Sequence, residues 1–143
     1  MRIIFDYNRT IFDPDTDDIY PGVLELLQRL SIKYELFLVS RNEPARKERV
    51  KDLAIDGYFQ EIVFVDKKSK QIFEKISGNS EIVVVVGDSI RDEIAIGNQL
   101  GFVTVRIKKG IFATMVPMCN DESPQYEIMD IRELENILSR YEK

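Results

Sequence analysis

The sequence predicts an α/β fold: a doubly wound, Rossmann-like three-layer sandwich whose sheet is mainly parallel and has five to six strands. Short apolar runs alternate along the chain with stretches of helical periodicity, a pattern that places helices on both faces of a parallel sheet. The run at residues 82–86 contains only Ile and Val, so it is apolar on both faces, as a central strand must be.

The expected elements follow one another in alternation. The first strand ends at Asp6, and the first helix starts after Pro21, which suits a first helical turn. Ser69 is an N-cap candidate for the helix at residues 69–76. Gly101 ends the helix at residues 92–100. Strands are predicted at residues 3–5, 35–39, 62–65, 82–86 and 102–107, and helices at residues 22–30, 43–53, 69–76, 92–100 and 131–137.

The chain length fits one domain, residues 1–143, without a separate cap. A chain of 143 residues lies in the usual size range of a single domain. Between Asn8 and Ser40 there is room for one loop and one helix, and between Ser40 and Lys67 for one helix and a short strand. Neither interval can hold a lid of substantial size.

Composition excludes several kinds of site. The net charge is -5 and no Lys/Arg run lacks nearby acids, so a nucleic-acid interface is not expected. The chain has no His and one Cys, Cys119, which excludes His-based nucleophilic catalysis, His- or Cys-rich zinc sites and an internal disulfide. No apolar stretch approaches the length of a membrane span or a secretion signal, so a soluble, cytoplasmic protein is expected.

Polar side chains follow three of the predicted strands. Asp6 and Ser40 each come directly after one of them, and Asp88 follows another after Gly87. Parallel strands present their carboxyl ends at one edge of the sheet, where ligands bind. Because an acidic protein that handles phosphate needs a cation to offset the like charge, a metal ion is expected at this edge.

Three segments, in the correct order, resemble motifs of the haloacid dehalogenase (HAD) superfamily. FDYNRT at residues 5–10 is similar to the first motif, DxDx(T/V). Ser40, after LFLV, matches the second motif, and VVGDSIRD at residues 85–92 matches the fourth, GDxxxD. PGVLELL at residues 21–27 and AIDGYFQEIV at residues 54–63 also resemble family members. The resemblance spans nearly the whole chain and implies a small, capless phosphatase-type member.

The resemblance assigns a nucleophile and a metal site. Asp6 would attack phosphorus and form an aspartyl phosphate. Asp6, Asp88, Asp92 and the backbone carbonyl of Asn8 would hold Mg²⁺, which prefers oxygen ligands and bridges to substrate phosphate.

The resemblance also assigns the phosphate contacts. Ser40, with the backbone amides of Arg41 and Asn42, would bind a phosphate oxygen. The family's third motif is a lysine that holds the nucleophile and the phosphate by charge. Lys67 is assigned this role from its place six residues before Phe73. The neighbouring Lys68 and Lys70 are the alternatives.

Asn8 departs from the family pattern. Phosphatases of the family usually have a second Asp there, which protonates the leaving group. An amide cannot shuttle a proton, and losing such a group typically costs on the order of 10²–10⁴-fold in rate. The chain would then be a slow phosphatase, an enzyme for acyl or aryl phosphates whose leaving group needs no proton, or a non-catalytic, regulatory phosphate-binding domain.

The remaining expectations are less specific. The substrate would be a phosphorylated small molecule or macromolecule, and homo-oligomer formation is left open. A response-regulator receiver also phosphorylates an Asp on a doubly wound fold, but it would use Asp66, after the third strand, and an acidic pair where only Asp6 stands. The apolar stretch at residues 112–118 is expected to cover the core, with a subunit contact as the alternative.

Overall fold

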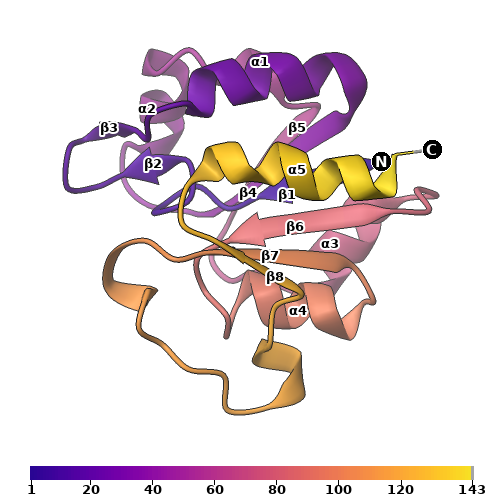
Figure 1. The fold of residues 1–143 in the computed structure, drawn as a ribbon. Helices are drawn as coiled ribbons and strands as arrows, with labels where there is room; N and C mark the ends of the chain where they lie inside the picture. The colour runs from indigo at the N-terminus through magenta and orange to yellow at the C-terminus, as the bar shows by residue number, and fades with distance from the viewer. Residues whose placement is uncertain (143) are drawn as a thin grey trace.

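A computed structural model describes residues 1–142 of the chain (Figure 1). Within that range the centre is a sheet of six parallel strands in the order β5-β4-β1-β6-β7-β8. The strands are β1 (Arg2–Phe5), β4 (Glu35–Arg41), β5 (Glu61–Val65), β6 (Val83–Gly87), β7 (Val103–Ile107) and β8 (Tyr126–Ile128).

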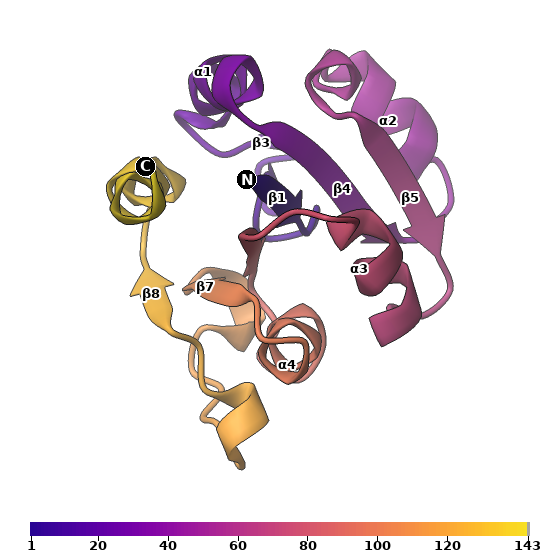
Figure 2. The same ribbon diagram turned by 90° about the vertical axis from the view of Figure 1, so that its right-hand side faces the viewer.

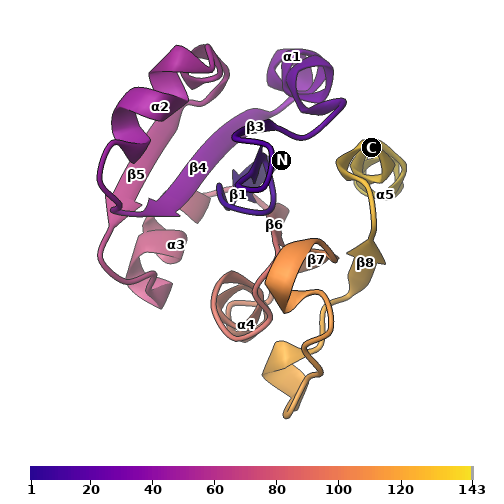
Figure 3. The ribbon, with the colours of Figure 1, turned by 90° about the vertical axis from the view of Figure 1, so that its left-hand side faces the viewer.

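Helices cover both faces of this sheet. Figures 2 and 3 show α1, α2 and α5 on one face and α3 and α4 on the other. The bounds are α1 (Val23–Lys33), α2 (Arg46–Asp52), α3 (Lys70–Ser77), α4 (Glu93–Gln99) and α5 (Leu134–Leu138). This is the three-layer arrangement that the alternating pattern predicts.

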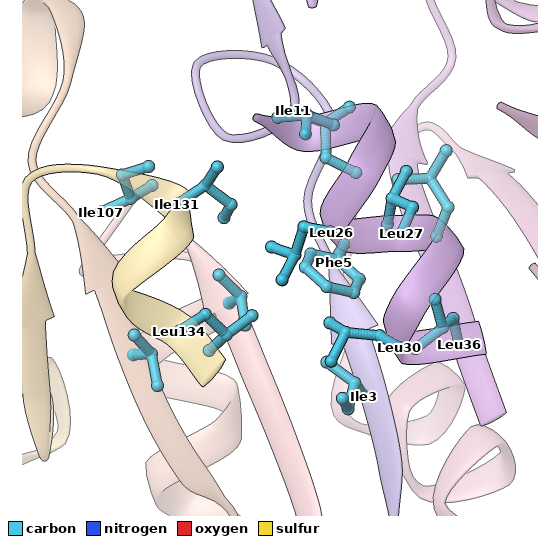
Figure 4. Packing of buried hydrophobic residues seen from close by; sticks show 14 of the residues in the cluster. Ile3, Phe5, Ile11, Leu26, Leu27, Leu30, Leu36, Ile107, Ile131 and Leu134 are labelled. Atoms are coloured by element: carbon cyan, nitrogen blue, oxygen red, sulfur yellow. The ribbon is translucent and has the colours of Figure 1, made fainter. Parts of the chain in front are cut away.

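The side chains of β1 alternate between the two cores. Ile3 and Phe5 join the larger cluster beneath α1 and α5, and Ile4 joins the smaller cluster beneath α3. Figure 4 shows Phe5 facing the apolar side of α1. The residues labelled there are Ile3, Phe5, Ile11, Leu26, Leu27, Leu30, Leu36, Ile107, Ile131 and Leu134.

The order of the strands creates a crevice beside β1. From β1 the chain moves outward through β4 and β5, and then crosses back to form β6 on the other side of β1. The carboxyl ends of β1 and β6 therefore lie at the point where the direction of winding reverses. Doubly wound sheets bind their ligands at such a point.

The predicted fold class is confirmed, and two pieces of it were not foreseen. β8 has only three residues, too few for a pattern, and the hairpin of β2 (Phe12–Asp13) and β3 (Asp18–Ile19) lies between β1 and α1. No segment of residues 1–142 forms a separate cap. In the same range, every helix is too short or too polar to cross a bilayer.

The expectation that residues 112–118 cover the core is wrong. Val116 and Met118 are 71% and 79% exposed. The reason is the buried guanidinium of Arg106, which donates to the carbonyls of Phe112 and Met115, at 2.8 and 2.7 Å. The loop is anchored through its backbone, so its aliphatic side chains point outward.

Candidate functional site

A cleft of about 440 Å³ opens where β1 and β6 end. The acidic side chains in its lining are Asp6, Glu43, Asp88, Asp92 and Glu93. The basic ones are Arg9, Arg41, Arg46, Lys67, Lys68 and Arg91. Basic side chains thus outnumber acidic ones here, although the chain as a whole has a net charge of -5.

Asp6 is held by a buried lysine. The Nζ of Lys68 donates to Asp6 Oδ1 at 2.6 Å and to Glu93 Oε1 at 2.8 Å. These three side chains are almost completely enclosed, with 9% or less of each residue exposed. Lys67, the lysine expected here, lines the same cleft but is exposed, and Lys70 is exposed on α3. The lysine that contacts Asp6 is therefore Lys68, one position further along the turn after β5.

Glu93, the first residue of α4, is a site residue that sequence reasoning missed. Its Oε2 accepts a hydrogen bond from the backbone N–H of Ser89 at 2.7 Å. Gly87 makes room for this arrangement, because a Cβ there would lie 2.4 Å from Glu93 Cγ. In the sequence, Glu93 looks like an ordinary first-turn acid at a helix N-terminus. The available signal was a second acid directly after Asp92.

Asp88 is paired with an arginine that the sequence did not single out. Arg9 donates from Nε to Asp88 Oδ2 at 3.0 Å. Its guanidinium lies 4.7 Å from the ring centre of Phe112, and its backbone is left-handed, with φ 59. A Cβ at Gly110 would lie 2.4 Å from Arg9 Cδ, so a glycine is needed there. The loop after β7 thus keeps Arg9 over the acid.

Burial and neighbouring charges give the acids of the site different pKa values. Burial raises the pKa of Asp88 to about 8, and the charge of Asp6 adds to that rise. Burial also raises the pKa of Glu93 to about 7, although the charge of Lys68 opposes it. Burial alone would raise the pKa of Asp6, but the charge of Lys68 and hydrogen bonds from Asp88 and Lys68 hold it below its ordinary value. Asp6 is therefore the carboxyl group kept ionised, as a nucleophile must be.

The acidic cluster fits a hard divalent cation. Carboxylate oxygens of Asp6, Asp88 and Glu93 lie within 4.8 Å of one another, and Mg²⁺ prefers oxygen ligands of this kind. Glu93 is the least suited of the three, because both of its oxygens accept short bonds, at 2.8 and 2.7 Å, whereas Asp6 Oδ2 accepts a longer one, from Thr10 at 3.5 Å. Asp6 and Asp88 are the better pair. The other expected ligands, Asn8 and Asp92, line the same cleft.

The expected phosphate contacts make hydrogen bonds and ion pairs within the chain. Ser40 is fully buried, and its hydroxyl donates to the carbonyl of Arg41 at 3.2 Å. The backbone N–H of Asn42 donates to the carbonyl of Val65 at 2.8 Å, so it is not directed at a ligand. Arg41 does reach the cleft, where its guanidinium lies 3.9 Å from Asp92.

A second hollow lies at the opposite end of the sheet. It has a volume of about 760 Å³, and its lining includes Arg2, Glu35 and Asn79, at the amino ends of β1 and β4 and near β6. It contains none of Asp6, Asp88 and Glu93. The chemistry therefore points to the smaller cleft.

Comparison with known sequences covers most of the chain. Residues 2–107 match the family described as haloacid dehalogenase-like hydrolase. The chain is also 30% identical over 135 residues to the glyceraldehyde 3-phosphate phosphatase of Methanopyrus kandleri. That alignment covers 87% of this chain and 58% of the relative, so the chain spans less than two thirds of the relative's length.

Comparison with solved structures finds the same fold. A HAD phosphatase from Thermococcus onnurineus superposes with a TM-score of 0.67 at 24% identity, over 84% of this chain and 58% of that one. The D,D-heptose 1,7-bisphosphate phosphatase of B. bronchiseptica, solved with magnesium and phosphate, gives a TM-score of 0.75 at 15% identity and covers 99% of both chains. At these identities the likeness concerns the fold.

Proposed function

The chain belongs to the haloacid dehalogenase-like hydrolase family, and we propose that it is a Mg²⁺-dependent phosphohydrolase that works through an aspartyl phosphate on Asp6. The observation that supports this most strongly is the environment of Asp6. Its carboxylate stands at the end of β1, is kept ionised by Lys68, and lies beside Asp88 in an open cleft.

The proposed reaction has two steps. In the first, a carboxylate oxygen of Asp6 attacks phosphorus, and the bond between phosphorus and the ester oxygen breaks with its electron pair on the leaving oxygen. In the second, the oxygen of a water molecule attacks phosphorus, and the bond between phosphorus and the carboxylate oxygen breaks with its electron pair on Asp6. Inorganic phosphate leaves, and the proton of the attacking water passes to solvent. Lys68 holds the nucleophile in place, and Glu93 holds Lys68. Mg²⁺, held by Asp6 and Asp88 with Asn8 and Asp92 nearby, would offset the charge that develops on the phosphoryl oxygens.

Asn8 limits the substrates that this chain could turn over. The residue lines the cleft and cannot protonate a leaving group. Acyl and aryl phosphates, whose leaving groups are stable as anions, are therefore the substrates that we expect to react fastest. The phosphorylated three-carbon substrate named for the Methanopyrus relative is a candidate for the natural class, as are other phosphorylated small molecules and phosphorylated macromolecules.

The test is hydrolysis of para-nitrophenyl phosphate with Mg²⁺ and with a chelator. We expect turnover only with the metal, and Asp6→Asn should lower it on the order of 10⁴-fold or more. Asp66→Asn is the matched control, because the same chemical change is made at an exposed acid after β5. Activity that survives both chelation and Asp6→Asn would contradict the proposed mechanism.

The second candidate is a non-catalytic phosphate-binding or regulatory domain on the same scaffold. The observation that favours it is Asn8. Binding of Mg²⁺ and inorganic phosphate without turnover of aryl or acyl phosphates would identify this case.

A further inference from the structure

Arg46 lines the cleft and contacts Ser40, the serine that the family pattern assigns to the phosphate. Ser40 is fully buried and does not line the cleft, whereas Arg46 does. The Nη1 of Arg46 donates to Ser40 Oγ and to the carbonyl of Arg41, both at 3.2 Å. The guanidinium therefore lies against the serine at the wall of the cleft.

The position of this guanidinium is fixed by its surroundings. Its Cζ lies 5.2 Å from the ring centre of Tyr7, which is stacked on Phe12 at 5.1 Å. Arg46 is the first residue of α2, and its backbone N–H donates to the carbonyl of Glu43 at 3.2 Å. Contacts on two sides leave little freedom, and a guanidinium that is already ordered loses less entropy when it binds an anion.

The charge of Arg46 is not neutralised by an ion pair. Within residues 1–142 it has no carboxylate within salt-bridge distance, and the same holds for Lys67 on this side of the cleft. By contrast, Arg41 pairs with Asp92 and Arg91 pairs with Glu122. Glu43 lines the same wall, but its carboxylate does not reach Arg46. An ordered arginine without a carboxylate partner, in the same cleft as Asp6, is suited to a phosphate oxygen.

We propose that Arg46 is the residue that contacts the phosphate group of the ligand on this wall, and that Ser40 acts as a positioning residue for Arg46. This inference rests on the proposed function only in placing the phosphate beside Asp6. The hydroxyl of Ser40 donates a hydrogen bond to the carbonyl of Arg41, and its Oγ accepts one from Arg46. Arg46 has further N–H donors that those contacts do not use.

The experiment measures binding of inorganic phosphate to the full chain by calorimetry, with Mg²⁺ present. Arg46→Ala should weaken binding about ten- to a hundredfold, the range for a lost hydrogen bond to a charged group. Arg46→Lys keeps the charge and should lose less. Ser40→Ala should lose less than Arg46→Ala, because it removes a support and not the contact.

Arg91→Ala is the control for general electrostatics. This substitution removes the same charge from the same cleft, but the guanidinium of Arg91 already pairs with Glu122. We therefore expect the affinity for phosphate to change by less than about threefold. The thermal midpoint of each variant shows whether it is folded, and Arg46→Lys keeps the test decisive if Arg46→Ala unfolds.

Some results would overturn this inference and others the proposed function. Equal losses for Arg46→Ala and Arg91→Ala, a larger loss for Ser40→Ala, or no phosphate binding by the wild type would each overturn the role of Arg46. If the wild type hydrolyses an aryl phosphate while Arg46→Ala binds phosphate normally, only the inference fails. If phosphate binding depends on Arg46 but nothing is hydrolysed, the inference stands and the proposed function fails.

Discussion

The two walls of the cleft are built in different ways. The acidic wall, formed by Asp6, Asp88 and Glu93, is buried at the ends of β1 and β6, with no more than 9% of any residue exposed. The basic wall is formed by Arg41 at the end of β4, Arg46 at the start of α2 and Lys67 after β5, and it is exposed or half-buried. One wall is packed into the fold, and the other is mostly solvated.

This difference predicts which substitutions should lower stability and which should affect only ligand binding. Charges on the acidic wall cannot be hydrated, so each depends on Lys68, Arg9 or a bound cation. Charges on the basic wall keep most of their contact with water, and their loss should cost little stability.

The largest effect should come from the two neighbouring lysines. Lys68→Met leaves Asp6 and Glu93 buried without their cation, and breaking such a pair typically costs about 3–5 kcal/mol of unfolding free energy. Lys67→Met changes an exposed residue and should stay within about 0.5 kcal/mol. Urea unfolding of both variants measures the difference. Equal losses of stability would contradict the assignment of Lys68.

The next effect concerns the glycine beneath Glu93. Gly87→Ala would put a Cβ 2.4 Å from Glu93 Cγ, and overpacking of this kind typically costs about 1–3 kcal/mol. It should also lower activity, because Glu93 can no longer hold Lys68. Gly57→Ala is the matched control, since nothing lies within 4 Å of a Cβ there. Similar unfolding midpoints for the two variants would show that Glu93 does not depend on Gly87.

A smaller effect should follow from restoring the missing acid. Asn8→Asp supplies a group that can protonate a leaving oxygen, so turnover of an alkyl phosphate should rise about tenfold or more. Turnover of an aryl phosphate should rise less, because its leaving group needs no proton. Steady-state rates on both substrates measure the ratio, and equal gains would mean that Asn8 does not stand beside the leaving group.

The last effect is a pH dependence of the stability of the metal-free protein. The pKa values of Asp88 and Glu93 in the folded state, about 8 and about 7, lie above their ordinary values, so the folded state keeps protons that the unfolded chain releases. These two groups therefore lower stability as the pH rises from about 4 to about 8. Asp6, with its lowered pKa, contributes stability that is lost only as the pH falls through the acid range.

Thermal unfolding in a chelator at about pH 5 and about pH 8 measures this dependence. The midpoint should be lower at the higher pH, and Mg²⁺ should reduce the difference because it favours the ionised acids. A midpoint that is the same or higher at the higher pH without metal would contradict the burial of these charges.

The sequence was sufficient where local pattern decides the structure. The all-aliphatic run at residues 82–86 and the spacing of the motifs predicted a central strand and brought Asp6 and Asp88 to one edge. β6 and the carboxylates of Asp6 and Asp88 lie where that reasoning put them. Both follow from periodicity and from the rule that parallel strands end at one edge.

The sequence was insufficient to predict site residues whose role depends on a single position or on a single tertiary contact. Lys67 and Lys68 differ by a single step, and the turn after β5 determines which one points inward. Glu93 reaches Lys68 only because Gly87 leaves space, and Arg46 reaches Ser40 across a loop of five residues (41–45). Such contacts depend on tertiary geometry that no periodicity encodes.

The most direct measurement is to identify the phosphorylated residue during turnover. The protein would be mixed with para-nitrophenyl phosphate and Mg²⁺, quenched in acid and analysed by peptide mass spectrometry. A transient phosphoryl group on Asp6, absent in the presence of a chelator, is the result expected here. Steady product release with no phosphoryl group on Asp6, or with one on Asp66, would contradict Asp6 as the nucleophile.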